Sequence, residues 1–341
     1  MRVEMVSARR LAAIMISIDA SSSSRASAPV LVVGSTGTVG GAVKRELEAR
    51  GVPMRLFLRR LPRPPSLSRI DLDAPSPPPI EQFRGDLRNR GDVEAALEGV
   101  RSAFYVSPHE PEEEEMARSF TRACQRRGIR MVFVGSHIDG ANRITRNLKR
   151  HLFGNLMPHY KAKFRLAERV RRSGAEAVLL TPSNFFQNDE LVRKVLVEEG
   201  RLIEPIGVEA IDRVDVRDVA EVAAEALVGS SVAPGAYQVS GPRALSGPEC
   251  AEIWSRASGR SIAYERDPES WCRLVRAQVA EPKASDVIKT YAKLEAHPVP
   301  VQAEAVAETT RIMGHAPRRY EDYVREMWAQ WSGRRNSAAA S

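Results

Sequence analysis

The 341-residue chain contains little cysteine and no long apolar segment. Its three cysteines, Cys124, Cys250 and Cys272, are odd in number and far apart, which argues against a disulfide framework and a cysteine metal knuckle. The six histidines show no spacing typical of metal ligands, so we expect no metal site. No stretch approaches the roughly 20 consecutive apolar residues that cross a bilayer, which excludes a protein with several membrane spans. We therefore expect reduced thiols, a cytoplasmic location and no membrane partner.

Basic charge is not concentrated in any one segment of the chain. The 51 lysines and arginines exceed the 43 aspartates and glutamates by 8, but basic pairs such as Arg59–Arg60 and Arg171–Arg172 are scattered. None forms a continuous basic helix or a basic stripe interleaved with aromatic residues, so we expect no nucleic-acid partner. A hydrophobic fraction of 43% and a charged fraction of 28% are ordinary for a globular protein and exclude a wholly disordered chain.

Residues 1–28 differ in composition from the rest of the chain. Two arginines precede the apolar run Leu11–Ile18, and Asp19 and a serine tract follow it. As a secretory signal the pattern is weak, because the apolar run is short and an acid follows it directly. An internal start at Met15, which leaves a disordered serine-rich leader, explains the segment as well. We treat residues 1–28 as a disordered leader or a misassigned start, outside the fold.

A strand, a glycine loop and a helix follow one another at the start of the folded part. The β-branched run Val30–Val33 is typical of a central strand of a parallel sheet. Gly34, Gly37 and Gly40 then recur at every third position, and residues 42–50 favour a helix. Glycines at such positions permit a tight turn, a close approach of the main chain to a pyrophosphate, and close packing of the helix on the strand.

This context favours a dinucleotide site over the alternative, a purely structural glycine turn. The diphosphate would meet free N–H groups and the positive end of the helix dipole. The residues expected to contact the cofactor here are Gly34, Thr36, Gly37, Thr38, Val39 and Gly40.

The end of the next strand indicates which cofactor is preferred. Met54–Leu58 is followed by Arg59 and Arg60, where an NAD site usually has an acid that accepts the adenosine ribose hydroxyls. A guanidinium pairs instead with a 2′-phosphate, so the sequence predicts NADP(H) over NAD(H), with both arginines in the site. The alternative is a solvated strand end.

Three further strands extend the predicted sheet. Residues 80–87 form a short strand with Asp86 at its carboxyl end, where we expect it to accept a hydrogen bond from the adenine amino group. Ser102–Val106 is a fourth strand, and residues 131–136 form a fifth, with the hydroxyl of Ser136 at its carboxyl end. The same edge is expected to add cofactor contacts from Leu87, Ser107 and Pro108.

The repeated alternation of strand and helix predicts an α/β fold with a doubly wound, Rossmann-type parallel sheet. We assign residues 29–183 to an NAD(P)-binding domain and residues 184–332 to a smaller α+β substrate-binding region interleaved with the sheet. Residues 333–341 are expected to form a disordered tail. Asp215 and Asp218 are interpreted as caps and dipole partners of a helix, because both lie near its start.

These pieces, in this order, resemble the NmrA-like branch of the atypical short-chain dehydrogenase/reductase superfamily. The likeness runs from about residue 29 to about residue 330, and the matching segments are 34–40, Arg59, 85–87, 97–100, 181–188, 213–220 and 237–242. The resemblance implies a Rossmann-type NAD(P)(H) domain with a smaller, variable substrate region. Members include quinone reductases, isoflavone-reductase-like enzymes, reductases of imines or enones, and redox-sensing regulators without turnover.

The usual catalytic pair of the superfamily, Tyr-x-x-x-Lys, is absent. Four residues after Tyr160 the chain has Phe164, although Tyr160 and Lys163 still share a helix face. The resemblance implies that Lys163 lies near the nicotinamide, where it holds the ribose or polarises a substrate oxygen, and that Ser136 is the superfamily serine. The alternatives are an exposed helix lysine and a strand-to-loop exit. The candidate catalytic residues are Lys163, Ser136 and Tyr160, of which the first two also contact the cofactor.

The substrate side is expected to come from residues 181–188 and from His137. Phe185 and Phe186 offer an aromatic surface for a planar ring, or else are ordinary core aromatics. Without the tyrosine acid, the simplest chemistry passes hydride from the nicotinamide to a small planar acceptor that takes charge readily, such as a quinone, an enone or an imine. The alternative is a non-catalytic NADP(H)-sensing regulator of the NmrA type. We expect a monomer or a homodimer.

Overall fold

The computed structural model describes residues 27–60, 78–107, 110, 112–135, 161–172 and 176–338, without the side chains of residues 161–163 and 334–338. Most of the expected leader, residues 1–26, lies outside this part. Within it, no helix is long and apolar enough to cross a membrane.

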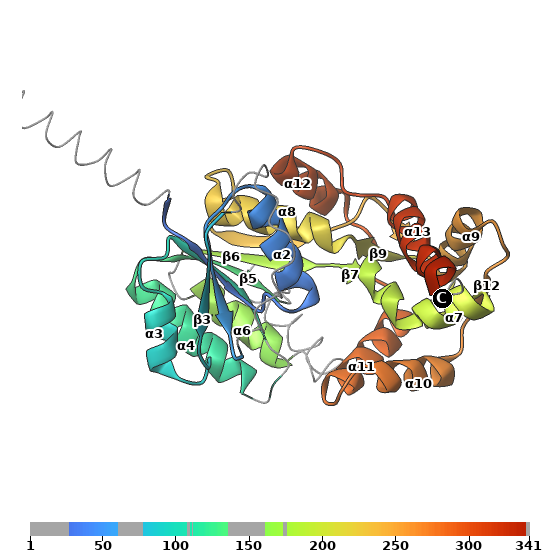
Figure 1. Cartoon of the computed structure of the whole chain (residues 1–341), viewed down its shortest axis with the longest axis horizontal. Helices are drawn as coiled ribbons and strands as arrows, with labels where there is room; N and C mark the ends of the chain where they lie inside the picture. Colours follow the sequence, from blue (N-terminus) through green and yellow to red (C-terminus); the bar gives the residue numbers. More distant parts are fainter. Residues whose placement is uncertain are drawn as a thin grey trace, which may run out of the picture.

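A seven-stranded sheet forms the centre of the larger part of the molecule (Figure 1). Its strands lie in the order β10-β6-β5-β4-β1-β2-β3, and every neighbouring pair is parallel. The residues of β1 are 0% to 2% exposed, as expected for an apolar run covered on both faces. The strand bounds are β1 Val30–Val33, β2 Met54–Leu58, β3 Ile80–Arg84, β4 Ser102–Val106, β5 Arg130–Val134, β6 Ala177–Pro182 and β10 Gly235–Val239. The predicted doubly wound, Rossmann-type sheet is confirmed.

Helices cover both faces of this sheet (Figure 1). One face carries α2 Thr38–Ala49, α8 Val216–Val228 and α12 Ala303–Met313, and the other carries α3 Arg90–Ala96, α4 Glu113–Arg126 and α6 Lys161–Arg172. Because successive side chains of a strand point to opposite faces, Val30 and Val32 join the apolar core under α2 and α8, while Leu31 and Val33 join the other core. Each face of the sheet therefore has its own core.

The remaining elements form a smaller α+β region (Figure 1). The chain passes into this region at the carboxyl end of β6, which is followed directly by β7. Two small sheets, ordered β11-β9-β7 and β12-β8, and a third apolar core hold it together. Its elements are β7 Asn184–Phe185, the 3₁₀ helix η2 Phe186–Val192, α7 Arg193–Glu199, β8 Arg201–Ile203, β9 Ile211–Val214, β11 Ala244–Leu245, α9 Gly247–Ser258, β12 Ala263–Glu265, α10 Pro268–Gln278, α11 Lys283–Ala296 and α13 Tyr320–Ala338. The chain returns from it to the main sheet through α8 and β10, so the two parts are interleaved.

A buried ion cluster lies within the third core. Arg213 is 0% exposed, and its guanidinium donates to Asp189 Oδ1 at 2.6 Å and to Glu204 Oε2 at 3.4 Å. The Trp254 Nε1 and the Tyr320 hydroxyl donate to the same Asp189 carboxylate. Burial raises the pKa of Glu204 to about 7. These bonds connect η2 and β9 to α9 and α13, and removal of Arg213 would leave two buried carboxyl groups without their cation.

The boundaries of two elements differ from the predictions. Helix α2 begins at Thr38 instead of residue 42, because it starts directly on the glycine loop. Strand β3 ends at Arg84, so Asp86 lies just beyond the strand. Helix α13 is assigned from Tyr320 to Ala338, and the disordered tail expected at residues 333–341 stays a prediction.

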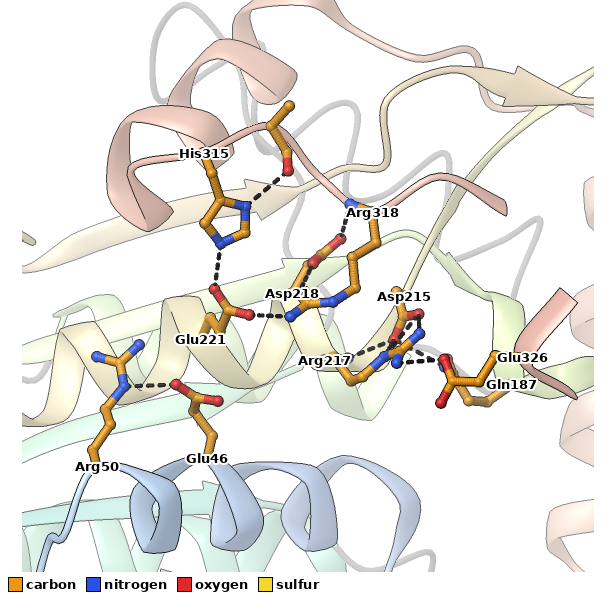
Figure 2. A network of polar contacts seen from close by, with 11 residues as sticks. Glu46, Arg50, Gln187, Asp215, Arg217, Asp218, Glu221, His315, Arg318 and Glu326 are labelled. Carbon is orange, nitrogen blue, oxygen red and sulfur yellow. Dashed lines mark hydrogen bonds and ion pairs between the residues drawn. The ribbon is translucent and has the colours of Figure 1, made fainter. Parts of the chain in front are cut away.

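The connection between α12 and α13 is tied to α8 by a network of ion pairs (Figure 2). His315 Nε2 lies 2.7 Å from Glu221 Oε2, and the Arg318 guanidinium pairs with both Glu221 and Asp218. The backbone N–H of Arg318 also donates to Asp218 Oδ2 at 2.9 Å. The Asp218 side chain is completely buried, and this burial raises its pKa to about 6. Arg318, in the connection, therefore balances the negative charge of the buried Asp218 carboxylate on α8.

Replacement of Arg318 by alanine should lower the free energy of unfolding by about 2–3 kcal/mol, because the Asp218 carboxylate loses its guanidinium partner. The loss should be smaller at about pH 5 than at about pH 8, since protonation of Asp218 removes the buried charge. Denaturant unfolding at the two pH values measures both effects. As a control, Arg325→Ala removes an exposed pair with Asp322 and should cost less than about 0.5 kcal/mol. Equal losses in the two variants would contradict the assignment.

Candidate functional site

The carboxyl edge of the sheet gathers the predicted cofactor residues. The loops after β1, β2, β3 and β4 carry residues 34–40, Arg59 with Arg60, residues 86–87, and Ser107. From β1 the chain moves outward to β2 and β3 and then returns to β4 on the other side of β1. This reversal is the topological switch point, outside which open α/β sheets bind their ligands.

Several candidate residues fall in segments that are not described. Pro108, Ser136, His137 and Tyr160 lie outside the described residues. The backbone of Lys163 lies in the first turn of α6, which follows β5. The predicted roles of these five residues therefore stay predictions.

The glycine loop folds into a tight turn against the start of α2. Gly34 has φ +83°, which favours glycine, and the Gly37 N–H donates to its carbonyl at 3.0 Å. A Cβ on Gly40 would lie 2.1 Å from the Gly34 carbonyl oxygen, and a Cβ on Gly34 would lie 2.4 Å from Val106 Cγ1. A Cβ on Gly37 would make only an ordinary contact, 3.5 Å from the same carbonyl oxygen. The fold therefore requires glycine at positions 34 and 40 but not at position 37.

The start of α2 is built to receive an anion. Its N-cap, Gly37, supplies no side-chain hydrogen bond, and the first turn contains no acid. Four other helices, by contrast, are capped by the side chains of Asn89, Asp215, Ser246 and Asp267. The Ser35 hydroxyl is buried beside the loop and has no hydrogen-bond partner among the described residues. An uncapped helix start, exposed through residues 36–38, suits the diphosphate of a dinucleotide.

A charged group, which we call the arginine corner, lies beside this loop and consists of Arg59, Asp86, Arg88 and Glu110. Arg59 is exposed after β2, as predicted, but its guanidinium pairs with Glu110. The same carboxylate pairs with Arg88. Asp86 accepts the backbone N–H of Arg88 at 2.9 Å and lies 3.5 Å from its guanidinium. Glu110 and Arg88 were not predicted as site residues, because their only signal is their place in loops at the carboxyl edge.

Two predicted cofactor contacts are engaged within the protein. Leu87 is only 9% exposed and packs in the core under α3 and α4. The Ser107 hydroxyl donates to Glu113 Oε2 at 3.4 Å, at the start of α4. Their side chains thus have partners in the fold, and a contact with a ligand from either position remains a prediction.

The two candidate aromatic residues after β6 have different surroundings. Phe186 is completely buried, and its ring centroid lies 5.1 Å from that of Tyr320 and 5.6 Å from that of Tyr323. It is thus one of the core aromatics that the sequence left as an alternative. Phe185 is partly exposed and packs against the core under α8. Of the predicted pair, only Phe185 is partly exposed, and its contact with a substrate stays a prediction.

The helix that would carry the superfamily's catalytic pair has an apolar residue instead of the lysine. Phe164, four residues after Tyr160, is 5% exposed on α6. No cluster of three or more histidine, cysteine or acidic side chains that could hold a metal ion occurs in the described part of the chain. The described residues therefore offer an anionic nucleotide a place at the uncapped start of α2. At position 164 they have phenylalanine and not the superfamily lysine.

Comparisons with known proteins agree with this geometry. An NAD(P)H azoreductase of Xenophilus azovorans is 30% identical over 235 residues, which cover 69% of this chain and 76% of that protein. The fold is similar to that of an NADPH-dependent quinone oxidoreductase from Escherichia coli solved with NADPH, with a TM-score of 0.68, 15% identity, and coverage of 88% of this chain and 99% of the other. It is also similar to NmrA, a negative transcriptional regulator solved with NADP, with a TM-score of 0.65, 17% identity, and coverage of 88% and 95%.

The two structural likenesses lie at low sequence identity and speak for the fold alone. The family is shown by the sequence, since residues 26–316 match the model of the NmrA-like family. This match includes the glycine loop, the arginine corner and most of the smaller region. The chain is therefore a member of the NmrA-like family, with its NAD(P)-binding Rossmann-type fold.

Proposed function

We propose that this chain is an NAD(P)H-dependent reductase that passes hydride to a small planar electrophile, such as a quinone, an enone or an imine. The observation that carries the proposal is Gly37, which the fold does not require but which stands open at the uncapped start of α2. A residue without a side chain there lets a diphosphate approach the helix amides. The azoreductase and the quinone oxidoreductase named above are NAD(P)H-dependent relatives that support this reaction class.

A bound nicotinamide would supply the hydride, which is the difficult part of the chemistry. The chain would hold the diphosphate on the amides of residues 38–40 and orient the ring toward the carboxyl ends of β5 and β6. Phe164 leaves α6 without the lysine of the superfamily pair. An acceptor that takes negative charge without a strong protein acid fits this arrangement best.

Lys163 and Ser136 are proposed to act at the reacting end of the cofactor. Lys163 belongs to the first turn of α6, and Ser136 comes two residues after the end of β5 in the sequence. Lys163 would hold the ribose or polarise a substrate oxygen, and Tyr160 would share its helix face. Phe185, from β7, and His137 would then face the substrate.

The arginine corner supports recognition of the adenosine half of the cofactor. Arg59 follows β2, the strand whose end normally recognises the adenosine ribose. The Arg59 side chain is 65% exposed, so a 2′-phosphate can reach its guanidinium. On this basis we propose that NADP(H) is preferred over NAD(H).

A second candidate function is that of an NADP(H)-binding regulator without turnover. The absence of Tyr-x-x-x-Lys favours it, and NmrA, a regulator, shares the fold. Loss of NADPH absorbance, measured against a panel of quinones, enones, imines and azo dyes, separates the two functions. Turnover of at least one acceptor class is expected. Tight NADPH binding without turnover of any acceptor would overturn the reductase and leave the regulator.

Gly37→Ala should leave the free energy of unfolding within about 1 kcal/mol of wild type, because its methyl group makes only an ordinary contact. The same methyl group should raise the Kd for NADPH and for NADH at least about tenfold, since it lies between the diphosphate and the helix amides. Fluorescence titration measures both constants. Gly41→Ala is the matched control, because the Gly41 N–H is already bonded to the Gly37 carbonyl at 2.7 Å. Unchanged affinity in Gly37→Ala would refute the diphosphate site.

Arg59→Ala should raise the Kd for NADPH by about ten- to a hundredfold while changing that for NADH less than about threefold. The reason is that only NADPH offers a phosphate to the guanidinium. Arg118→Ala, which removes an exposed arginine paired with Glu115 on α4, controls for the loss of one positive charge. If the affinities for NADPH and NADH fall equally, Arg59 does not recognise the phosphate.

Lys163→Ala should lower kcat at least about tenfold, because the nicotinamide ribose or the substrate oxygen loses its cationic partner. The Kd for NADPH should stay within about threefold of wild type. Steady-state kinetics with the best acceptor and a binding titration make the comparison, with Lys161→Ala from the same helical turn as control. Wild-type turnover in Lys163→Ala would leave Lys163 a surface residue.

A further inference from the structure

The carboxylate of Glu110 lies between two guanidinium groups of the arginine corner. One of its oxygens pairs with Arg59 Nη1 and the other with Arg88 Nη2. The Glu110 side chain is only 17% exposed, compared with 65% for Arg59. The Glu110 carbonyl accepts the Glu113 N–H at 3.0 Å, which anchors the residue to the start of α4. Glu110 is therefore held in place at the corner.

Glu110 also brings an acid to a place that lacks one. Strand β2 is followed by two arginines, Arg59 and Arg60, whereas NAD sites usually have an acid at this position. Strand β1 lies between β4 and β2, so Glu110, from the loop after β4, reaches across the end of β1 to meet Arg59. The long-range pair thus places a carboxylate beside the end of β2, where the adenosine ribose is recognised.

The charges of the corner are largely balanced before any nucleotide arrives. Arg88 pairs with Glu110, with Glu112 at 3.2 Å and with Asp86 at 3.5 Å. A 2′-phosphate that binds Arg59 must compete with Glu110 for the guanidinium and lie near a group of the same charge. The hydroxyls of NAD(H) bring no such charge and can donate to a carboxylate.

We propose that Glu110 is a specificity-determining residue that weakens the grip of Arg59 on the 2′-phosphate and so allows both NADPH and NADH to bind. The inference rests on the proposed function, because it presupposes a nicotinamide cofactor on the glycine loop. It deepens that proposal by placing an acid from a neighbouring loop against the arginine that favours NADP(H). The preference for NADP(H) is then moderate in the wild-type chain and strong when Glu110 is neutralised.

Titration of wild type and Glu110→Gln with NADPH, NADH, 2′-phospho-ADP-ribose and ADP-ribose tests this inference without any turnover. The ratio of the Kd for NADH to the Kd for NADPH should rise about tenfold in Glu110→Gln, as expected for removal of one charge near a phosphate. The two ADP-ribose ligands should show the same shift, because they carry the adenosine half alone. Glu110→Ala gives the same comparison if the glutamine variant does not fold.

Glu112→Gln is the matched control. It removes the same charge from the edge of the corner, where Glu112 pairs with Arg88, whereas the Arg59 guanidinium pairs with Glu110. Its ratio should change less than about threefold. A ratio in Glu110→Gln that stays within about threefold of wild type, or that moves toward NADH, would overturn the role of Glu110. Failure of wild type to bind any of the four ligands would instead refute the proposed function.

Discussion

The close approach of Gly40 to the Gly34 carbonyl is the constraint on which the rest of the site depends. With only 2.1 Å between that oxygen and the position of a Cβ, the helix can start directly on the end of β1 only if residue 40 is glycine. This contact sets the first amides of α2 at the switch point of the sheet. It also lets α2 pack beside α8, whose own start is tied to the connection before α13 (Figure 2).

The first strands and the glycine loop were predictable because their signals are local. The apolar run of β1, the spacing of its glycines and the strand Met54–Leu58 can each be recognised within a few residues. The helix cap at Asp215 is local in the same way. Local patterns of this kind determine the elements and, through the alternation of strand and helix, the parallel sheet.

The surroundings of the site were not predictable, because they come from residues far apart in the sequence. Arg59 meets Glu110 only because β2 and β4 flank the same strand. Phe186 is buried by Tyr320 and Tyr323, which arrive on the last helix of the chain. Packing of this kind decides whether an arginine is free to bind a phosphate and whether an aromatic ring faces a ligand. Spacing along the chain contains neither piece of information.

The central claim is that this chain binds a nicotinamide dinucleotide through the amides at the start of α2. Isothermal titration of the purified wild-type protein with NADPH and with NADH tests it most directly, since heat of binding is seen whether or not the chain catalyses a reaction. We expect one nucleotide to bind per chain, with micromolar or tighter affinity for at least one of the two. A chain that is folded by circular dichroism but releases no heat of binding with either nucleotide would contradict it.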